Sequence, residues 1–222
     1  MAKRKTKPPI FTFLRGYDLD LPRNDLAVLL TNTTVMRPEK GGKSSRAKLG
    51  VVRQSLEAYH DLLAWMEQVD AIRPAAAKEL LRQSREDRDE AARIFNHVLN
   101  LRSLFSRITG SLCASKLPAK KDFEELGAAV EEVQPTPLRF VAAPGGGAWT
   151  WGRTGKDLGW PRRELVLSMA VLLSSENRRH VRRCAGKDCS VVFVDNSRSR
   201  QRRWCSKAAC GEPERASRRS SR

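Results

Sequence analysis

Apolar residues recur at intervals of three and four along much of the chain, the spacing that places side chains on one face of an α-helix. One series consists of Leu49, Val52, Leu56, Tyr59, Leu63 and Met66. A longer series predicts a helix over about residues 86–115, with the apolar face Ile94, Val98, Leu101, Leu104, Phe105, Ile108 and Leu112. Shorter helices are expected at residues 25–31, 74–83, 121–133 and 161–179. The pattern therefore predicts a mainly α-helical protein.

One stretch with strand-forming composition interrupts the helical pattern. Residues 138–141 and 148–151 contain β-branched and aromatic side chains, and glycines at 145–147 separate them. This arrangement is typical of a β-hairpin. Trp149 and Trp151 alternate with Thr150 and are expected to share one strand face, where core packing is the expected role. The predicted fold is a helical domain with a small β-hairpin.

The charge of the chain is strongly positive and unevenly distributed. Lys and Arg number 42 against 25 Asp and Glu, a formal net charge of +17. Residues 178–222 hold 14 of these bases and four acids, a net charge of +10, and residues 1–9 are expected to form a disordered basic arm. Such a charge attracts polyanions, namely nucleic acid, anionic lipid or acidic protein. The C-terminal end is therefore the predicted contact region.

Nothing in the sequence predicts export or membrane insertion. The basic N-terminus is followed by Lys7-Pro8-Pro9 rather than by an apolar stretch. The most apolar run, residues 165–173, is about half the roughly 20 residues that a membrane span requires. We expect a cytoplasmic protein without a membrane partner.

Four of the five cysteines form two matched pairs. Cys184 and Cys189, like Cys205 and Cys210, are separated by four residues, and 15 residues lie between the pairs. Two such pairs can supply four thiolates for tetrahedral zinc from a short chain. The alternatives are four unrelated cysteines or two disulfides, and a cytoplasmic location argues against disulfides. An all-thiolate site has no open position, so the predicted zinc is structural.

The residues between and after the cysteines predict a treble-clef-like finger. Residues 191–194 are strand-forming, and Ser206 is placed to cap a short helix that carries Cys210. The finger is expected to show its first arginines on a hairpin, and further arginines follow in a tail. The candidate nucleic-acid contacts are Arg198, Arg200, Arg202, Arg203, Lys207, Arg215, Arg218 and Arg219. Guanidinium groups contact phosphate and guanine edges, although a solvated face is the alternative for any arginine run.

The cysteine segment resembles the CGNR zinc-finger family of bacterial proteins. The matching positions are Cys184, Cys189, Phe193, Asp195, Ser197, Arg203, Trp204, Cys205, Ser206, Cys210 and Gly211. Residues 31–33, 61–65 and 101–105 are similar, more weakly, to motifs of the ABATE-type domain that precedes the finger in this family. The resemblance implies a helical ABATE-like domain at residues 10–177, a four-cysteine zinc finger at 178–214 and a basic tail at 215–222.

The resemblance also implies a function, although this chain departs from the family pattern after Gly211. The family is regarded as a set of transcription regulators, often linked to stress, with the finger as DNA reader. Its helical domain is a candidate ligand sensor, which makes Asn32 and Arg102 possible pocket residues. The expected location is then the nucleoid. After Gly211 the family has Asn-Arg, whereas this chain has Glu212 and Pro213, which puts the mode of nucleic-acid binding in question.

Other functions have less support in the sequence. A protein-interaction adaptor finger and an RNA-binding protein remain alternatives to a DNA-binding regulator. No Ser/His/Asp or Cys/His set has a catalytic spacing, so we expect no enzyme. His60, His97 and His180 are scattered singly, and Cys113 is expected to be a buried free thiol.

Overall fold

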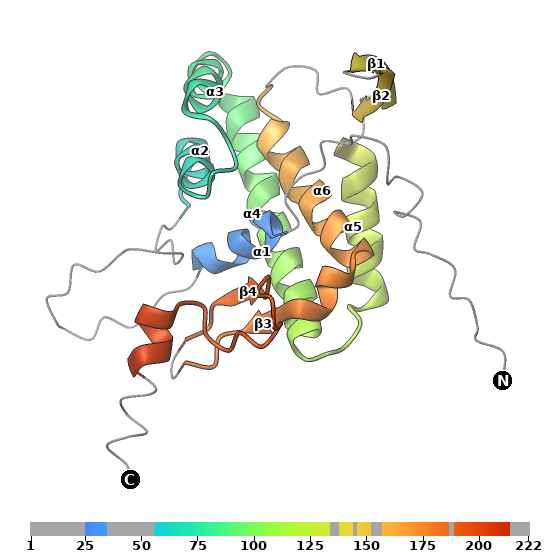
Figure 1. Cartoon of the computed structure of the whole chain (residues 1–222). Helices are drawn as coiled ribbons and strands as arrows, with labels where there is room; N and C mark the ends of the chain where they lie inside the picture. The colour runs from blue at the N-terminus through green and yellow to red at the C-terminus, as the bar shows by residue number, and fades with distance from the viewer. Residues whose placement is uncertain are drawn as a thin grey trace, which may run out of the picture.

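The computed structural model describes residues 25–34, 56–133, 138–143, 146–151, 157–186 and 189–213. Within these ranges the chain is mostly helical (Figure 1). The helical elements are α1 (Leu26–Thr31), η2 (Asn32–Thr34), α2 (Tyr59–Gln68), α3 (Pro74–Glu86), α4 (Arg88–Cys113), α5 (Lys120–Val133), α6 (Trp160–Ser174), η3 (Glu176–His180) and η4 (Lys207–Gly211). The strands are β1 (Leu138–Ala143), β2 (Gly146–Trp151), β3 (Val181–Arg183) and β4 (Val192–Val194). The predicted fold class is confirmed.

Helix α4, with 26 residues, is the central element, and it contacts each of the other α-helices (Figure 1). The carboxylate of Asp87 caps its first turn by accepting a 3.0 Å hydrogen bond from the Glu90 N–H. The apolar face predicted from the sequence is buried, and Phe105 and Ile108 are fully enclosed. Trp65 of α2 is buried in the same core. The long amphipathic helix therefore organises the domain.

Two predicted helix boundaries are wrong, each for a local reason. Helix α6 ends at Ser174, not near residue 179, because Ser175 is extended with ψ 163° and the next residues form the 3₁₀ turn η3. Helix α2 begins at Tyr59, because Ala58 is extended and the Asp61 carboxylate accepts the N–H groups of residues 57 and 58, both at 3.0 Å. Residue 56 is buried ahead of this helix, and residues 49–55 lie outside the described ranges.

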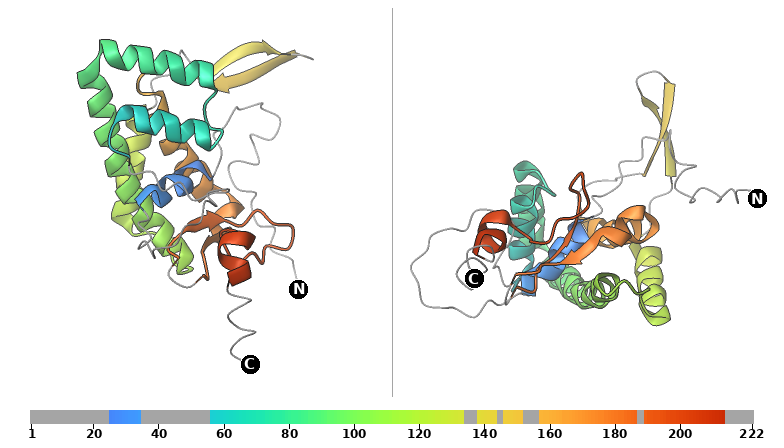
Figure 2. Two further views of the ribbon diagram at one scale, coloured as in Figure 1. Left: turned by 90° about the vertical axis from the view of Figure 1, so that its left-hand side faces the viewer. Right: turned by 60° about the horizontal axis from the view of Figure 1, so that its bottom comes forward.

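The hairpin of β1 and β2 is antiparallel and pairs Leu138 with Trp151 and Ala143 with Gly146. It confirms the predicted hairpin, and it projects away from the helices (Figure 2). The side chains of Trp149 and Trp151 lie outside what the structure describes, so their expected packing stays a prediction.

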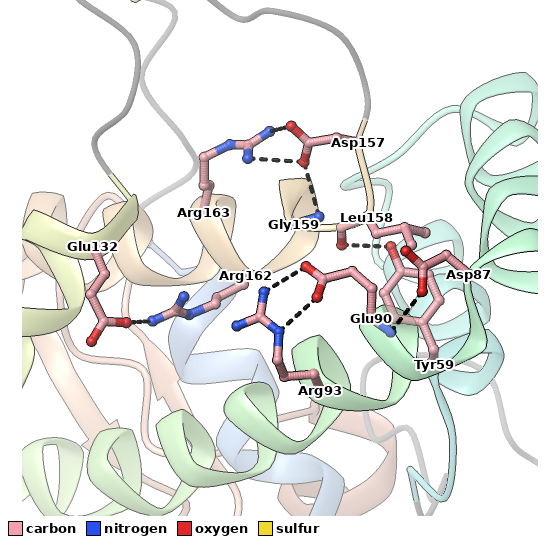
Figure 3. A network of polar contacts seen from close by, with 10 residues as sticks. All are labelled: Tyr59, Asp87, Glu90, Arg93, Glu132, Asp157, Leu158, Gly159, Arg162 and Arg163. Carbon is pink, nitrogen blue, oxygen red and sulfur yellow. Dashed lines mark hydrogen bonds and ion pairs between the residues drawn. The ribbon is translucent and has the colours of Figure 1, made fainter.

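Polar contacts join α2 and α5 to the start of α6 (Figure 3). The buried Tyr59 hydroxyl donates a 2.8 Å hydrogen bond to the carbonyl of Leu158. The Arg162 guanidinium, on a side chain only 13% exposed, pairs with the Glu132 carboxylate. Because the Glu132 side chain is 60% exposed, this ion pair adds at most about 1 kcal/mol, and the buried Tyr59 hydrogen bond is the stronger constraint on the start of α6. No described helix is long and apolar enough to cross a membrane.

Helix α1 lies between the helical bundle and the antiparallel pair of strands β3 and β4 (Figures 1 and 2). Its Ala27 N–H, which has no partner within the helix, donates a 3.0 Å hydrogen bond to the buried Ser168 hydroxyl of α6. Val181, Val192 and Val194 of β3 and β4 belong to the same apolar core as the helices. The core is therefore continuous across residue 177, where the sequence predicts a domain boundary.

Candidate metal centre

The four paired cysteines come from two turns of backbone that face each other. Cys184 follows β3, and a turn closed by the 3.1 Å bond from the Cys189 N–H to the Gly186 carbonyl leads to Cys189. Cys205 precedes η4, and Cys210 lies within it. The Ala185 N–H donates to the Arg203 carbonyl at 2.8 Å and joins the two turns. The local folds bring together pairs that are 15 residues apart in sequence.

The helical turn that carries Cys210 is capped as the sequence predicts. The Ser206 hydroxyl accepts a hydrogen bond from the Ala209 N–H at 3.2 Å, and the Ser206 carbonyl accepts from the Cys210 N–H at 3.2 Å. The turn is π-helical rather than α-helical over Lys207–Gly211. A hydrophobic cluster of Cys184, Cys189, Val191, Phe193 and Cys210 surrounds the sulfurs.

The sulfur geometry fits zinc. The four Sγ atoms lie within 4.8 Å of one another, and the separations from Cys205 to Cys189 and to Cys210 are 3.8 and 3.7 Å. A tetrahedron with Zn–S bonds of about 2.3 Å has edges of about 3.8 Å. None of the five cysteines is joined in a disulfide, so the disulfide alternative does not hold. The cluster is a closed four-thiolate site, which suits a structural zinc ion.

The electrostatics of the cluster also call for a cation. Burial raises the pKa of Cys205, and the neighbouring Cys189 thiolate raises it further. Burial likewise raises the pKa of Cys210, to about 11. Four thiolates cannot therefore coexist here at neutral pH unless a metal compensates their charge. The Gly186 and Cys205 N–H groups donate to the Cys184 sulfur at 3.4 and 3.3 Å, which fixes its position in the cluster.

At position 186, the turn between Cys184 and Cys189 has room for glycine only. A Cβ on Gly186 would lie 3.0 Å from the Cys210 Cβ and 3.1 Å from its sulfur, which cannot move away while it ligates a metal. We expect Gly186→Ala to weaken zinc binding about tenfold or more, measured by competition with a chromophoric chelator. Gly127→Ala is the control, because a Cβ there meets nothing within 4 Å and alanine favours the helix by about 1 kcal/mol. Equal zinc affinity of the two variants would show that the first turn tolerates a side chain.

The segment between β4 and the second turn, residues 195–204, is called here the arginine loop. Its organising residue is Asp195, which is completely buried. The Asp195 carboxylate accepts hydrogen bonds from the Ser197 N–H and hydroxyl at 3.0 and 2.6 Å and from the Arg202 N–H at 2.9 Å. Burial alone would raise the pKa of Asp195, but these bonds and the nearby Arg200 guanidinium lower it. An ionised carboxylate therefore shapes the loop.

The sequence predicts that the first arginines lie on a hairpin. In the structure they lie instead on this irregular loop after β4. The extended run is interrupted because the Asp195 carboxylate draws the backbone of residues 197 and 202 inwards. Arg200 adopts a positive φ of 52°, an uncommon conformation for a residue with a side chain.

The predicted contact residues fall into two structural groups. The Arg202 guanidinium stacks on Phe193 at 4.6 Å from the ring centroid and donates to the Trp204 carbonyl at 2.8 Å and to the Cys205 carbonyl. Arg200 donates to the Asp195 carbonyl. Arg198, Arg203 and Lys207 form the second group; they are exposed, as Arg200 and Arg202 are, and Arg203 lies over the Trp204 ring at 5.4 Å. Arg215, Arg218 and Arg219 lie outside the described residues.

Asn32 and Arg102, the predicted pocket residues, lie close together but are engaged with the protein itself. Asn32 is buried, and its amide contacts the backbone of Val192 through two hydrogen bonds. The Arg102 guanidinium donates to the Thr33 hydroxyl at 3.2 Å, and burial lowers its pKa. A ligand pocket at these residues stays a prediction.

The remaining cysteine and the histidines lie away from the sulfurs. Cys113 is partly buried at the end of α4, where burial raises the pKa of its thiol. No histidine belongs to the metal cluster found among the described residues. Sequence reasoning did not find the contact of Asn32 with β4, for which an early Asn-Thr motif is the only local indication, nor the steric role of Gly186.

The comparison with protein families agrees with this geometry. Residues 180–222 match the model of the CGNR zinc finger. The matched segment contains the four metal-site cysteines and the arginine loop, and it begins within η3. No match to a curated protein was found. The C-terminal segment is therefore similar to CGNR zinc fingers in sequence and has the sulfur cluster of a metal-binding finger.

Proposed function

We propose that this protein binds DNA through its CGNR-type finger and acts as a transcription regulator located at the nucleoid. The observation that carries the proposal is the set of exposed cations on the metal-held finger. Arg198, Arg203 and Lys207 are exposed, and none of them forms an ion pair with an acid among the described residues. Unpaired cations on a rigid scaffold suit phosphate contacts, because the scaffold orders them before binding.

The proposal assigns different roles to the two groups of arginines. Arg200 and Arg202 use their guanidinium donors on carbonyl groups of the finger, so they shape the loop. Arg198, Arg203 and Lys207 are the phosphate-binding residues. The proposal includes no catalytic activity, and it leaves a small-molecule effector of the helical domain as a further expectation from the family resemblance.

We expect the triple variant Arg198→Ala/Arg203→Ala/Lys207→Ala to bind duplex DNA more weakly and with less salt dependence. Each phosphate contact adds about −0.9 to the slope of log K against log salt, so losing three makes the slope shallower by about 2.7. Fluorescence anisotropy over a salt series measures both quantities, and zinc content is checked in parallel.

The matched control removes two arginines and one lysine from the opposite end of the molecule. Arg73, Lys78 and Arg85 are exposed on or next to α3, far from the finger (Figure 1). Their replacement by alanine lowers the net charge equally but leaves the finger intact. If both triple variants reduce the slope equally, the finger is not the contact site.

A protein-binding adaptor finger is the second candidate. Glu212 and Pro213 are exposed directly after η4, where the family pattern has Asn-Arg, and an acid there weakens attraction to phosphate. Genomic immunoprecipitation separates the candidates, since a DNA-binding regulator gives discrete peaks. A flat profile together with salt-resistant capture of a protein partner would favour the adaptor. Competition between RNA and DNA duplexes distinguishes the RNA-binding alternative.

A further inference from the structure

Strand β4 has two edges, and only one of them is covered by β3. The Cys184 N–H donates to the Val191 carbonyl at 2.8 Å, and the Asp195 N–H donates to the His180 carbonyl at 2.8 Å. In an antiparallel pair, successive residues point their N–H and C=O groups to alternate sides. The N–H and C=O of Val192 therefore point away from β3, towards α1.

Asn32 satisfies both of these groups. Its Nδ2 donates to the Val192 carbonyl at 2.8 Å, and its Oδ1 accepts from the Val192 N–H at 2.9 Å. The amide thus pairs with Val192 as a neighbouring strand residue would. Asn32 is only 5% exposed, and the two residues are 160 positions apart in the chain.

The helical domain holds Asn32 in place. Its own N–H donates to carbonyl groups of α1, and the following Thr33 hydroxyl donates to the Leu30 carbonyl at 2.8 Å and accepts from Arg102 of α4. Helix α1 is in turn bonded to α6 through Ser168. The Asn32 amide is therefore a fixed point of the helical domain.

From Val192 the strand leads directly to the residues that shape the arginine loop. Phe193 carries the stacked Arg202 guanidinium, and Asp195 binds the backbone of the loop. Val192 is three residues from Cys189 and three from Asp195. Through the contact of Asn32 with Val192, the helical domain can set the orientation of Phe193 and Asp195.

We propose that Asn32 is a positioning residue: its amide, paired with Val192, sets the orientation of the arginine loop relative to the helical domain. This inference rests on the proposed function for its effect on DNA binding. Asn32 is not one of the metal-site residues, and its amide contacts Val192 of β4.

The test compares Asn32→Ala, which removes both contacts, with Asn32→Asp, which keeps the size and the acceptor but loses the donor. Amide exchange of the zinc-loaded full chain is followed by NMR at Val192 and in the arginine loop. A side-chain hydrogen bond of ordinary strength protects an amide about 2- to 10-fold. We expect Val192 exchange to accelerate by about this factor in Asn32→Ala, with one zinc retained per chain. Asn100→Asp is the control, because Asn100 is exposed on α4.

The expected DNA result is an affinity about tenfold lower for Asn32→Ala at full zinc occupancy. Asn32→Asp should be at least as weak, because a carboxylate oxygen would face the Val192 carbonyl in a buried site. Unchanged Val192 exchange in Asn32→Ala would overturn the contact itself. Faster exchange at Val192 with unchanged exchange in the arginine loop and unchanged DNA affinity would overturn the positioning role. If the wild-type protein does not bind DNA, the proposed function fails, and the exchange of the arginine loop still decides the role of Asn32.

Discussion

Cys189→Ser is expected to abolish stoichiometric zinc binding and to unfold the finger. Among the described residues the buried cluster of the finger has five members, three of them metal-site cysteines, too few to hold the fold without a metal. In small zinc fingers, metal binding supplies on the order of 10 kcal/mol of folding free energy. Because Val181, Val192 and Val194 pack in the core of the helices, the melting temperature of the helical domain should fall as well. Metal analysis and calorimetry measure the two effects.

Cys113→Ser is the matched control for this experiment. It makes the same replacement at the partly buried thiol outside the metal cluster. We expect full zinc content and a stability loss of about 1–2 kcal/mol from placing a hydroxyl in an apolar site. Chelation of the wild-type protein should reproduce the spectrum of Cys189→Ser. A Cys189→Ser protein that keeps one tightly bound zinc and the wild-type melting profile would contradict the assignment of the four ligands.

Asp195→Asn is expected to destabilise the zinc-loaded protein by about 2–3 kcal/mol. Asparagine has the same shape, but its amide nitrogen replaces one carboxylate oxygen. One of the donors from Ser197 and Arg202 then faces another donor in a buried site. The lowered pKa of Asp195 sets the pH range of the effect. The ionised carboxylate stabilises the fold above its ordinary pKa of 3.8 and loses this contribution as the pH falls.

Chemical denaturation at neutral pH measures the effect of Asp195→Asn. Asp89→Asn provides the comparison, since Asp89 is exposed at the start of α4 and should change stability by no more than about 0.5 kcal/mol. Zinc content is measured for each variant, because lost metal would enlarge the effect. Equal stability of the two variants would show that the loop does not depend on the buried carboxylate.

The sequence predicted what local periodicity and spacing can encode. The apolar face of α4, the proline at the start of α3 and the paired cysteines each depend on residues within a few positions of one another. The same holds for the Ser206 cap. These features follow from helix geometry and from metal-ligand spacing, so the structure confirms them.

The features that the sequence did not predict depend on distant or competing contacts. Helix α2 starts late because the Asp61 carboxylate captures backbone N–H groups that a longer helix would use. The arginines lie on a loop because buried Asp195 competes with strand pairing. The pairing of Asn32 with Val192 spans 160 residues, and no periodic pattern records such a contact.

The valines of β3 and β4 have a practical consequence for anyone who transplants the finger. A fragment of residues 178–222 carries every sulfur ligand, but it leaves Val181, Val192 and Val194 without the helices that cover them. The exposed valines would favour self-association of the fragment. A chimaera that grafts this finger onto another host should therefore import the matching surfaces of α1 and α4 as well.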